Sequence, residues 1–380
     1  MRQLRFWALS ALAGLTACAG SAAPPPPVPQ LAPDHLVARI YLIGDAGDPR
    51  IGSEPVLQAL SHDLRAQTAE PVVVFLGDNV YPRGMPAADD SGRAEAERRL
   101  LAQIQTVQNA GAKAYFVLGN HDWDRFGADG WNAALRQERY IDSVGKGFAT
   151  LKPGGGCPGP STIDIGSRVR LLLLDTQWWL HSGPKPEGAG SSCPTRSEPE
   201  VIDSVRAALR NAGSRLIIVA AHHPLSSGGV HGGNFGWEDH IFPLRLVSPI
   251  LWIPLPYIGS LYPAARQNGV SSQDMSSRAY QRLIAAFSSA FRDVPPALYA
   301  AGHEHNLQVI AGGAGRLELV SGGGIYGHTG RAVRIRGSLF ARNASGFARL
   351  DVPSTGRARL AVLEVSPAGE SHEVFSTWVE

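Results

Sequence analysis

The sequence has only three cysteines in 380 residues and no long run of like charge. Its 35 basic and 33 acidic residues leave a formal net charge of +2. Such a balance gives no support for nucleic-acid binding through a basic face, and no nucleic-acid partner is expected. The sequence also lacks an internal repeat and a second linker. We therefore expect one globular domain with loop insertions after the N-terminal region.

Two of the three cysteines lie in loop sequence rich in glycine, proline and serine. These are Cys157 and Cys193. An exported compartment permits a disulfide, so we predict a Cys157–Cys193 bridge. Two unrelated free thiols are the alternative.

The N-terminal apolar run is too short to span a bilayer. Phe6 to Leu15 follows two arginines and has the length of a signal-peptide core. It ends in Leu15-Thr16-Ala17-Cys18, which resembles the bacterial lipobox. We predict a lipoprotein-type signal peptide over residues 1–18, with Cys18 lipidated and holding the protein to a membrane of the cell envelope, on the periplasmic side or in the outer membrane. The alternative is an ordinary secretory signal and a periplasmic or secreted protein.

Residues 19–35 are dense in proline and form a predicted tether, because such sequence favours an extended backbone and cannot build a core. The globular domain is expected over residues 36–380. Within it, an insertion is expected at about residues 232–272. Its segment 241–263 is apolar, but Pro243, Pro249, Pro254 and Pro256 argue against a transmembrane helix and a central strand. It is interpreted as a loop packed on the core or, alternatively, as a hydrophobic lid or membrane-facing patch.

Apolar, strand-like runs in the domain repeatedly end in polar side chains. The ends are Gly44-Asp45, Gly77-Asp78, Gly119-Asn120-His121, His222-His223 and Gly302-His303-Glu304-His305. The first three runs alternate with helical segments, which is the rhythm of a parallel sheet. In such sheets reactive groups gather beyond the carboxyl ends of the strands. We therefore expect the five ends to converge on one site.

The apolar and polar pattern of the domain also predicts its strands and helices. Strands are expected at 37–43, 71–76, 112–118, 162–165, 169–174 and 216–221, and helices at 53–67 with Ser53 as N-cap, 93–110, 199–212 and 273–291. Beyond Gln308, strand-like segments alternate with glycine-rich turns and suggest a β-rich second sheet.

The strand ends supply a set of potential metal ligands. Oxygen and nitrogen donors without thiolate suit ions such as Fe, Zn or Mn. A carboxylate can bridge two ions, and two ions roughly 3.5–4 Å apart suit in-line attack at phosphorus. The candidate ligands are Asp45, Asp78, Tyr81, Asn120, His222, His303 and His305.

The motifs GDAG, GDNVY, GNHD, AAHHP and GHEHN resemble those of the calcineurin-like metallophosphoesterases, and more narrowly the small, tartrate-resistant type of purple acid phosphatase. They occur in family order over roughly residues 40 to 310. Gly47 replaces the usual histidine of Asp-x-His, and Tyr81 is the ligand that marks the purple branch. The resemblance implies an α/β fold, a four-layer α/β/β/α sandwich with two mixed sheets. The insertion and the C-terminal β segment depart from the family and leave the substrate open.

The resemblance also implies a role for each residue. An Fe(III) ion would bind Asp45, Tyr81 and His305, a divalent Fe, Zn or Mn ion would bind Asn120, His222 and His303, and Asp78 would bridge them. A metal-bound hydroxide would be the nucleophile. His121 and His231 are the candidate proton donors, and a solvated loop histidine is the alternative for His231. Asp122 and Glu304 are expected either to orient ligands or to be solvated turn residues.

The predicted activity is that of an exported metal-dependent phosphoric ester hydrolase, an acid phosphatase that cleaves small phosphate monoesters. One alternative is a phosphodiesterase with the same dinuclear site. The other is a non-catalytic surface lipoprotein that binds phosphate or metal.

Overall fold

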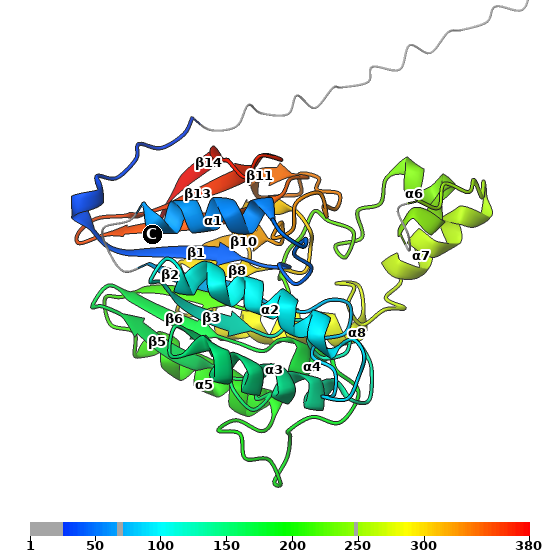
Figure 1. The fold of residues 1–380 in the computed structure, drawn as a ribbon, viewed down its shortest axis with the longest axis horizontal. Coiled ribbons are helices and arrows are strands. Elements are labelled where there is room, and N and C mark those ends of the chain that lie inside the picture. Colours follow the sequence, from blue (N-terminus) through cyan, green and yellow to red (C-terminus); the bar gives the residue numbers. More distant parts are fainter. Residues whose placement is uncertain (1–25, 67–70, 247–249) are drawn as a thin grey trace, which may run out of the picture.

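The computed structural model describes residues 26–66, 71–246 and 250–380 (Figure 1). The predicted signal peptide, the lipid at Cys18 and the first part of the tether lie outside the described residues. The rest of the tether leads through a short 3₁₀ turn, η1 (Pro33–His35), into the first strand. It is bound to the body, because the Val28 N–H donates to Ser376 Oγ at 3.1 Å and Arg359 Nη2 donates to the Val28 carbonyl at 3.0 Å.

Strands from both ends of the domain form the first sheet. Its order is β14-β13-β12-β1-β2-β3-β4. Strands β1 to β4 are parallel, and β12, β13 and β14 add antiparallel strands beside β1. The bounds are β1 (Leu36–Ile43), β2 (Val72–Leu76), β3 (Lys113–Val117), β4 (Ala149–Leu151), β12 (Gly346–Pro353), β13 (Ala358–Val365) and β14 (Ser371–Val379).

The second sheet is also mixed and has the order β11-β9-β10-β8-β7-β6-β5. Its central strands β6, β7, β8 and β10 are parallel, whereas β5, β9 and β11 run antiparallel to their neighbours. The bounds are β5 (Ser161–Ile165), β6 (Val169–Leu173), β7 (Leu216–Ala220), β8 (Leu298–Ala301), β9 (Leu307–Ala311), β10 (Leu317–Ser321) and β11 (Ser338–Arg342).

Side chains that alternate between the two faces of each strand form two hydrophobic cores. Ile40 and Leu42 of β1 pack against residues of the second sheet, such as Leu171 and Ile218. The side chains between them point to the other face of the sheet and pack with helix residues. This arrangement follows from the period of two in a strand, and it leaves both sheets buried on both faces.

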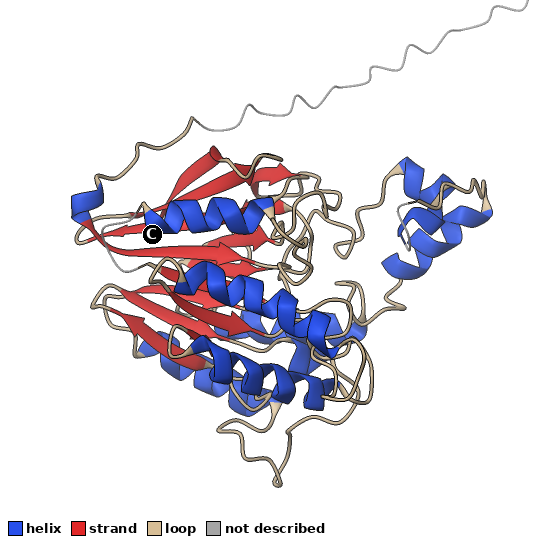
Figure 2. Cartoon of the chain, in the orientation of Figure 1, coloured by secondary structure: helices blue, strands red, loops and turns tan. Residues whose placement is uncertain are grey.

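Helices cover the two outer faces (Figures 1 and 2). Helices α1 (Pro55–Arg65), α2 (Arg93–Gln108) and α3 (Gly130–Gly145) lie over the first sheet, and α4 (Gln177–Leu180), α5 (Glu198–Arg210) and α8 (Arg278–Ala290) lie over the second. The order of layers is therefore helix, sheet, sheet, helix, and the predicted four-layer α/β/β/α sandwich with two mixed sheets is confirmed.

Three details of the sequence-based prediction were wrong. The strands beyond Gln308 are divided between the two sheets, because β12 pairs with β1 while β9 to β11 join β8. Helix α3 was not predicted. The N-cap of α1 is Glu54, whose side chain accepts from the Val56 N–H at 3.4 Å, and not Ser53. By contrast, the predicted Cys157–Cys193 disulfide is present.

A small helical subdomain stands out from the sandwich, joined to it by two chain segments (Figure 1). It comprises α6 (Trp237–Ile241), η2 (Pro243–Leu246), η3 (Ile258–Ser260) and α7 (Leu261–Gln267). The described residues of the apolar segment 241–263 thus lie in this projection, and the interpretation of the segment as a loop packed on the core is wrong for them. Among the described residues, no helix is long and apolar enough to cross a membrane.

Candidate metal centre

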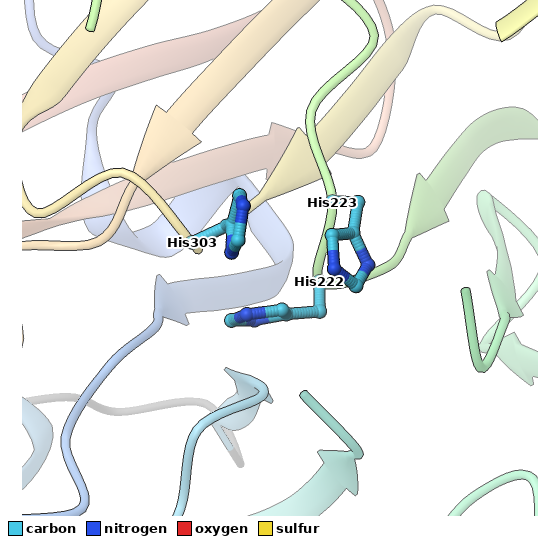
Figure 3. A group of neighbouring side chains, drawn as sticks. All are labelled: His222, His223 and His303. Atoms are coloured by element: carbon cyan, nitrogen blue, oxygen red, sulfur yellow. The ribbon is translucent and has the colours of Figure 1, made fainter. Parts of the chain in front are cut away.

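All seven predicted ligands come together at one edge of the sandwich. Asp45 follows β1, Asp78 and Tyr81 follow β2, and Asn120 follows β3, all from the first sheet. His222 follows β7, and His303 and His305 follow β8 of the second sheet, so both sheets contribute. Figure 3 shows His222 and His303 approaching one another from these two strand ends.

The first group of ligand atoms surrounds the Tyr81 hydroxyl. Its oxygen lies 3.1 Å from Asp45 Oδ1, 3.2 Å from Asp78 Oδ2 and 3.0 Å from His305 Nε2. His305 Nε2 is itself 3.4 Å from Asp45 Oδ1. These are the four side chains expected around the first ion.

The second group surrounds the Asn120 amide oxygen. Asn120 Oδ1 lies 3.0 Å from His222 Nε2 and 3.1 Å from His303 Nδ1. Asp78 Oδ1 is 3.5 Å from His222 Nε2, whereas its other oxygen faces Tyr81. Asp78 therefore reaches both groups with different oxygens, as a bridging carboxylate would.

The spacing of these atoms fits metal coordination. Donors bound at right angles to an ion at about 2.1 Å are about 3 Å apart. Five of the separations within the two groups, at 3.0–3.2 Å, are close to that value, and the other two are 3.4 and 3.5 Å. Three imidazoles, two carboxylates, a phenol and an amide also form the kind of mixed donor set that first-row metals accept.

Hydrogen bonds to backbone carbonyls fix the direction of two imidazole lone pairs. His222 Nδ1 lies 2.8 Å from the Leu76 carbonyl, and His303 Nε2 lies 3.0 Å from the Gln273 carbonyl. A carbonyl oxygen only accepts, so each of these nitrogens carries the proton. The opposite nitrogen of each ring then presents its lone pair to Asn120 and the second group, as required of a metal ligand.

His223 is not available as a ligand, although its ring nitrogens approach those of His222 and His303 (Figure 3). Its Nδ1 lies 2.8 Å from Thr176 Oγ1, and its Nε2 lies 2.8 Å from Gln273 Oε1. Both nitrogens therefore have partners outside the metal centre. His223 instead packs behind the two ligand imidazoles.

The pKa values of the acidic side chains in the cluster are strongly shifted. Burial, with Asp78 nearby, raises the pKa of Asp45 to about 8. Burial and the two carboxylates raise the pKa of Tyr81 well above its usual value. Burial also opposes ionisation of Asp78, but the imidazoles of His222 and His121 outweigh it and lower the pKa. Cations would reverse the effect of burial, because they stabilise the ionised forms that bind them.

Two of the candidate ligand imidazoles, those of His303 and His305, are held in the neutral form that binds metal. Burial and the neighbouring imidazoles place the pKa of His303 well below its usual value. Burial likewise lowers the pKa of His305. Both rings therefore keep a lone pair at neutral pH.

Three ligands adopt left-handed backbone conformations. The φ angles are 60° at Asp45, 54° at Asp78 and 70° at His303. Non-glycine residues seldom adopt this region, and functional sites are where such strain concentrates. At Gly119 a Cβ would lie 2.3 Å from Asp78 Oδ1, so the close approach of the β3 and β2 loops requires glycine.

Asp122 is buried and supports the loops that carry the candidate ligands. The sequence alone did not decide between this role and that of a solvated turn residue. The Asp122 carboxylate accepts the N–H groups of Asn79 at 2.9 Å, Val80 at 3.0 Å and Gly119 at 2.8 Å. It thereby ties the loop of Asp78 to the loop of Asn120. Glu304 is buried as well and accepts from Ser227 Oγ at 2.9 Å. The alternative of solvated turn residues is wrong for both.

His121 lies beside the first group of ligands. Its Nδ1 is 2.7 Å from the Pro82 carbonyl, and its Nε2 is 3.9 Å from Asp78 Oδ2. The ring packs on Tyr81 with centroids 4.3 Å apart. Burial lowers the pKa of His121. The ring is thus at the metal centre with one nitrogen facing it.

His231 packs on the opposite side, with its ring centroid 4.1 Å from that of His303. Its Nδ1 lies 2.9 Å from Asp274 Oδ1, and Arg266 forms an ion pair with the same carboxylate. His231 is therefore not a free loop histidine. No local pattern could reveal this contact, because Asp274 and Arg266 lie far along the chain in and after the helical subdomain.

His328 also borders the site, although the sequence assigned it no role. Its ring centroid lies 4.2 Å from that of His305 and 5.8 Å from that of Tyr81. It comes from the loop after β10, which carries no motif. His328 comes near the ligands only because β9 and β10 pair as antiparallel strands.

Comparison with known proteins agrees with this geometry. The sequence profile of the calcineurin-like phosphoesterases matches residues 38–307. No curated protein sequence matches the chain.

Solved structures share the fold at low sequence identity. GAP50, described as the anchor in the inner membrane complex of Plasmodium, is 14% identical with a TM-score of 0.55, over 90% of this chain and 88% of its own. PhoD is 12% identical with a TM-score of 0.54, over 93% of this chain and 70% of its own. The purple acid phosphatase PPD1 from yellow lupin seeds is 16% identical with a TM-score of 0.52, over 89% of this chain and 53% of its own.

The profile spans most of the chain and covers all seven ligand positions, from Asp45 to His305. The chain belongs to the calcineurin-like phosphoesterase family and, with it, to the metal-dependent phosphoester hydrolases.

Proposed function

We propose that the chain is a phosphomonoesterase of the purple acid phosphatase type, with Asp45, Tyr81 and His305 holding Fe(III) and with Asn120, His222 and His303 holding divalent Fe, Zn or Mn. Asp78 bridges the two ions. The observation that carries the proposal is the phenol of Tyr81 within 3.2 Å of two carboxylates and an imidazole. The phenol has one proton to donate and yet faces two carboxylates and an imidazole, and a cation bound among these groups would stabilise its ionised form.

Two ions at this centre would supply Lewis-acid polarisation of a phosphoryl oxygen and a water nucleophile that ionises near neutral pH. The protein's own part is to hold the ligands and to supply a proton. His222 and His303 are oriented by their bonds to backbone carbonyls, so the site is organised before substrate arrives. His121 and His231 lie on opposite sides of it and are the proposed proton donors to the leaving alkoxide.

His231 has the geometry that a general acid needs. Asp274 Oδ1 at 2.9 Å and Arg266 Nη2 at 3.1 Å both contact Nδ1, which leaves Nε2 as the nitrogen that exchanges a proton with a leaving group. Asp274 is itself held by Arg266. The ring orientation is therefore set from outside the ligand cluster.

The test combines colour, metal content and turnover. Tyrosinate bound to Fe(III) gives a visible charge-transfer band, so the purified protein should be coloured, and Tyr81→Phe should lose the band while keeping its fold. Metal analysis should find two ions per chain. An aryl phosphate should be cleaved faster than a bis-aryl phosphate.

Other outcomes have distinct meanings. Faster cleavage of the bis-aryl phosphate would assign the site to phosphodiesters. Two bound ions without turnover of either ester would leave a non-catalytic binding protein. A colourless protein with a full metal complement would exclude the tyrosinate-bound ferric ion.

A further inference from the structure

Large apolar side chains are exposed together on the helical subdomain. Seven of them lie within a stretch of 25 residues, whereas the other exposed large apolar side chains of the described chain are scattered over the sandwich and its loops. We call the seven the apolar tip. They are Trp237, Ile250, Trp252, Ile253, Tyr257, Ile258 and Leu261.

The exposure within the tip is nearly complete at several positions. The exposed fraction is 95% for Tyr257, 85% for Ile250 and 69% for Leu261. Residues 246–265 contain no aspartate, glutamate, lysine or arginine. Seven large apolar side chains exposed on one small subdomain mark a place of contact with another apolar phase.

The subdomain has its own internal structure, so the tip is not a loop waiting to pack on the core. The Leu255 N–H donates to the Ile241 carbonyl at 2.7 Å, and the Gly259 N–H donates to the Leu255 carbonyl at 2.7 Å. Phe242 packs on Trp252 with ring centroids 5.4 Å apart. The backbone groups are thus paired locally, while the apolar side chains face outward.

The base of the subdomain is fastened to the sandwich. Arg266 pairs with Asp274, and Gln267 Nε2 donates to the Gly233 carbonyl at 2.9 Å. The tip therefore projects from a fixed base (Figure 1).

We propose that the apolar tip inserts into the interfacial layer of a lipid bilayer. Trp and Tyr together with Ile and Leu are the residues that partition into this layer, where aromatic rings meet both headgroups and acyl chains. Between Ile250 and Leu261 the tip has no charged side chain of the kind that aligns two protein surfaces. The contact is a shallow one, since no described helix could span the membrane.

The chain outside the structure supports a bilayer as the partner. The lipid-attachment site predicted at Cys18 lies ten residues before Val28, which is bound to the last strands of the sandwich. Ten residues of extended proline-rich chain span about 31 Å. A lipid at Cys18 would therefore hold the body close to the membrane, where the apolar tip can make a second contact. This inference is independent of the metals and of the reaction.

The experiment measures contact at the tip itself. The full chain carrying Cys18→Ser, which cannot be lipidated, receives either Tyr257→Cys or Ile51→Cys for labelling with an environment-sensitive dye. Ile51 is 82% exposed on the sandwich and serves as the matched control. Cys157 and Cys193 are joined to each other and do not take the dye.

With vesicles of phosphatidylcholine, the emission at position 257 should shift to the blue and the emission at position 51 should not. The shift should persist at high salt, because the tip carries no charge to be screened. Adding Ile250→Ser and Leu261→Ser should weaken the vesicle affinity reported at position 257 by at least about tenfold. Adding Phe126→Ser and Phe148→Ser on the sandwich should leave it unchanged.

Three results would overturn the proposal. The first is no blue shift at position 257, and the second is an equal shift at both positions. The third is a shift at position 257 that occurs without vesicles and grows with protein concentration, which would assign the tip to a second copy of the chain. Loss of the phosphatase activity would not change any of these fluorescence measurements.

Discussion

His222 and His223 are neighbours in sequence, yet the partners of their ring nitrogens distinguish the proposed metal ligand from a structural residue. His222 gives one nitrogen to a backbone carbonyl and keeps the other for the centre. His223 has partners at both nitrogens, Thr176 and Gln273. Because imidazole has only two nitrogens, the second arrangement leaves none for an ion.

Substitution of the two histidines should therefore have different consequences. We expect His222→Ala to lose one bound ion and to lower kcat/KM by at least about a hundredfold, since it removes a ligand and not merely its support. His223→Ala should keep both ions but destabilise the fold by about 1–3 kcal/mol, because it leaves buried polar partners unpaired. Metal analysis and urea unfolding of both variants check this. Equal loss of metal from the two variants would contradict it.

Asp175 is a buried carboxyl away from the ligands, and it makes stability depend on pH. Burial raises its pKa to about 8, compared with about 3.9 in an unfolded chain. The folded state keeps a proton that the unfolded state releases between these values. The stabilisation is complete at low pH and is lost as the pH rises toward 8.

Asp175→Asn cannot ionise and should remove this contribution. The wild-type free energy of unfolding should fall relative to the variant by up to about 1.4 kcal/mol per pH unit between pH 5 and 8. The asparagine oxygen can still accept from Trp123 Nε1, as the carboxylate does at 2.9 Å. Urea titrations at pH 5.5, 6.5 and 7.5 measure the slopes. Parallel slopes in the two proteins would show that Asp175 is ionised throughout.

At the scale of elements, the site was predictable where a motif directly follows a strand. The GD, GDNVY, GNHD and GHEHN turns are continuous in sequence, so period and composition revealed them together. Contacts made between distant elements were not predictable. The Asp274 partner of His231 lies 43 residues away, and His328 reaches the ligands only through the pairing of β9 and β10.

The sequence likewise did not indicate which sheet each C-terminal strand joins. Strands β12 and β13 are buried along nearly their whole length, as β9 and β10 are, so their apolar pattern indicates strands without indicating a neighbour. Which sheet a C-terminal strand joins depends on which strand edge is free. One edge of β1 is not paired with the parallel strands, and β12 pairs with that edge in antiparallel orientation. This is a property of the assembled sheet and not of the segment.

The disulfide joins two loops that no other regular element ties together. Cys157 lies between β4 and β5, and Cys193 lies between α4 and α5, with 36 residues separating them. Closing a loop of that size restricts the unfolded chain and stabilises the fold by roughly 4 kcal/mol on the chain-entropy estimate.

Replacing both cysteines, Cys157→Ser with Cys193→Ser, should lower the free energy of unfolding by about that amount while leaving metal content and kcat unchanged. Urea unfolding with and without reductant measures it. The double variant serves as the control, because reductant should not affect it. An unchanged urea midpoint in the reduced wild-type protein would mean that the bridge adds nothing to stability.

At the scale of the whole molecule, the metal centre is the point where the two sheets are joined. Asp45, Asp78 and Asn120 come from the first sheet, and His222 and His303 come from the second. The sheets also meet through apolar packing, such as that of Leu42 and Leu76 against the second sheet, and through hydrogen bonds such as that from Ser321 Oγ to the Leu42 carbonyl at 2.8 Å. Ions bound here would link the sheets by bonds that the unfolded chain does not form.

Removal of the ions should therefore lower the stability of the entire sandwich. We expect a chelator to reduce the melting temperature of the wild-type protein by at least a few degrees, because occupancy at 100 times Kd contributes about 2.7 kcal/mol per site. Restoring iron and zinc should reverse the effect. His222→Ala, which has lost a ligand, should respond less to the chelator, whereas Cys157→Ser with Cys193→Ser should respond as fully as the wild type. A chelator that empties the site without moving the wild-type transition would show that packing between the sheets alone sets the stability, and that the ligands are held in place whether or not the ions are bound.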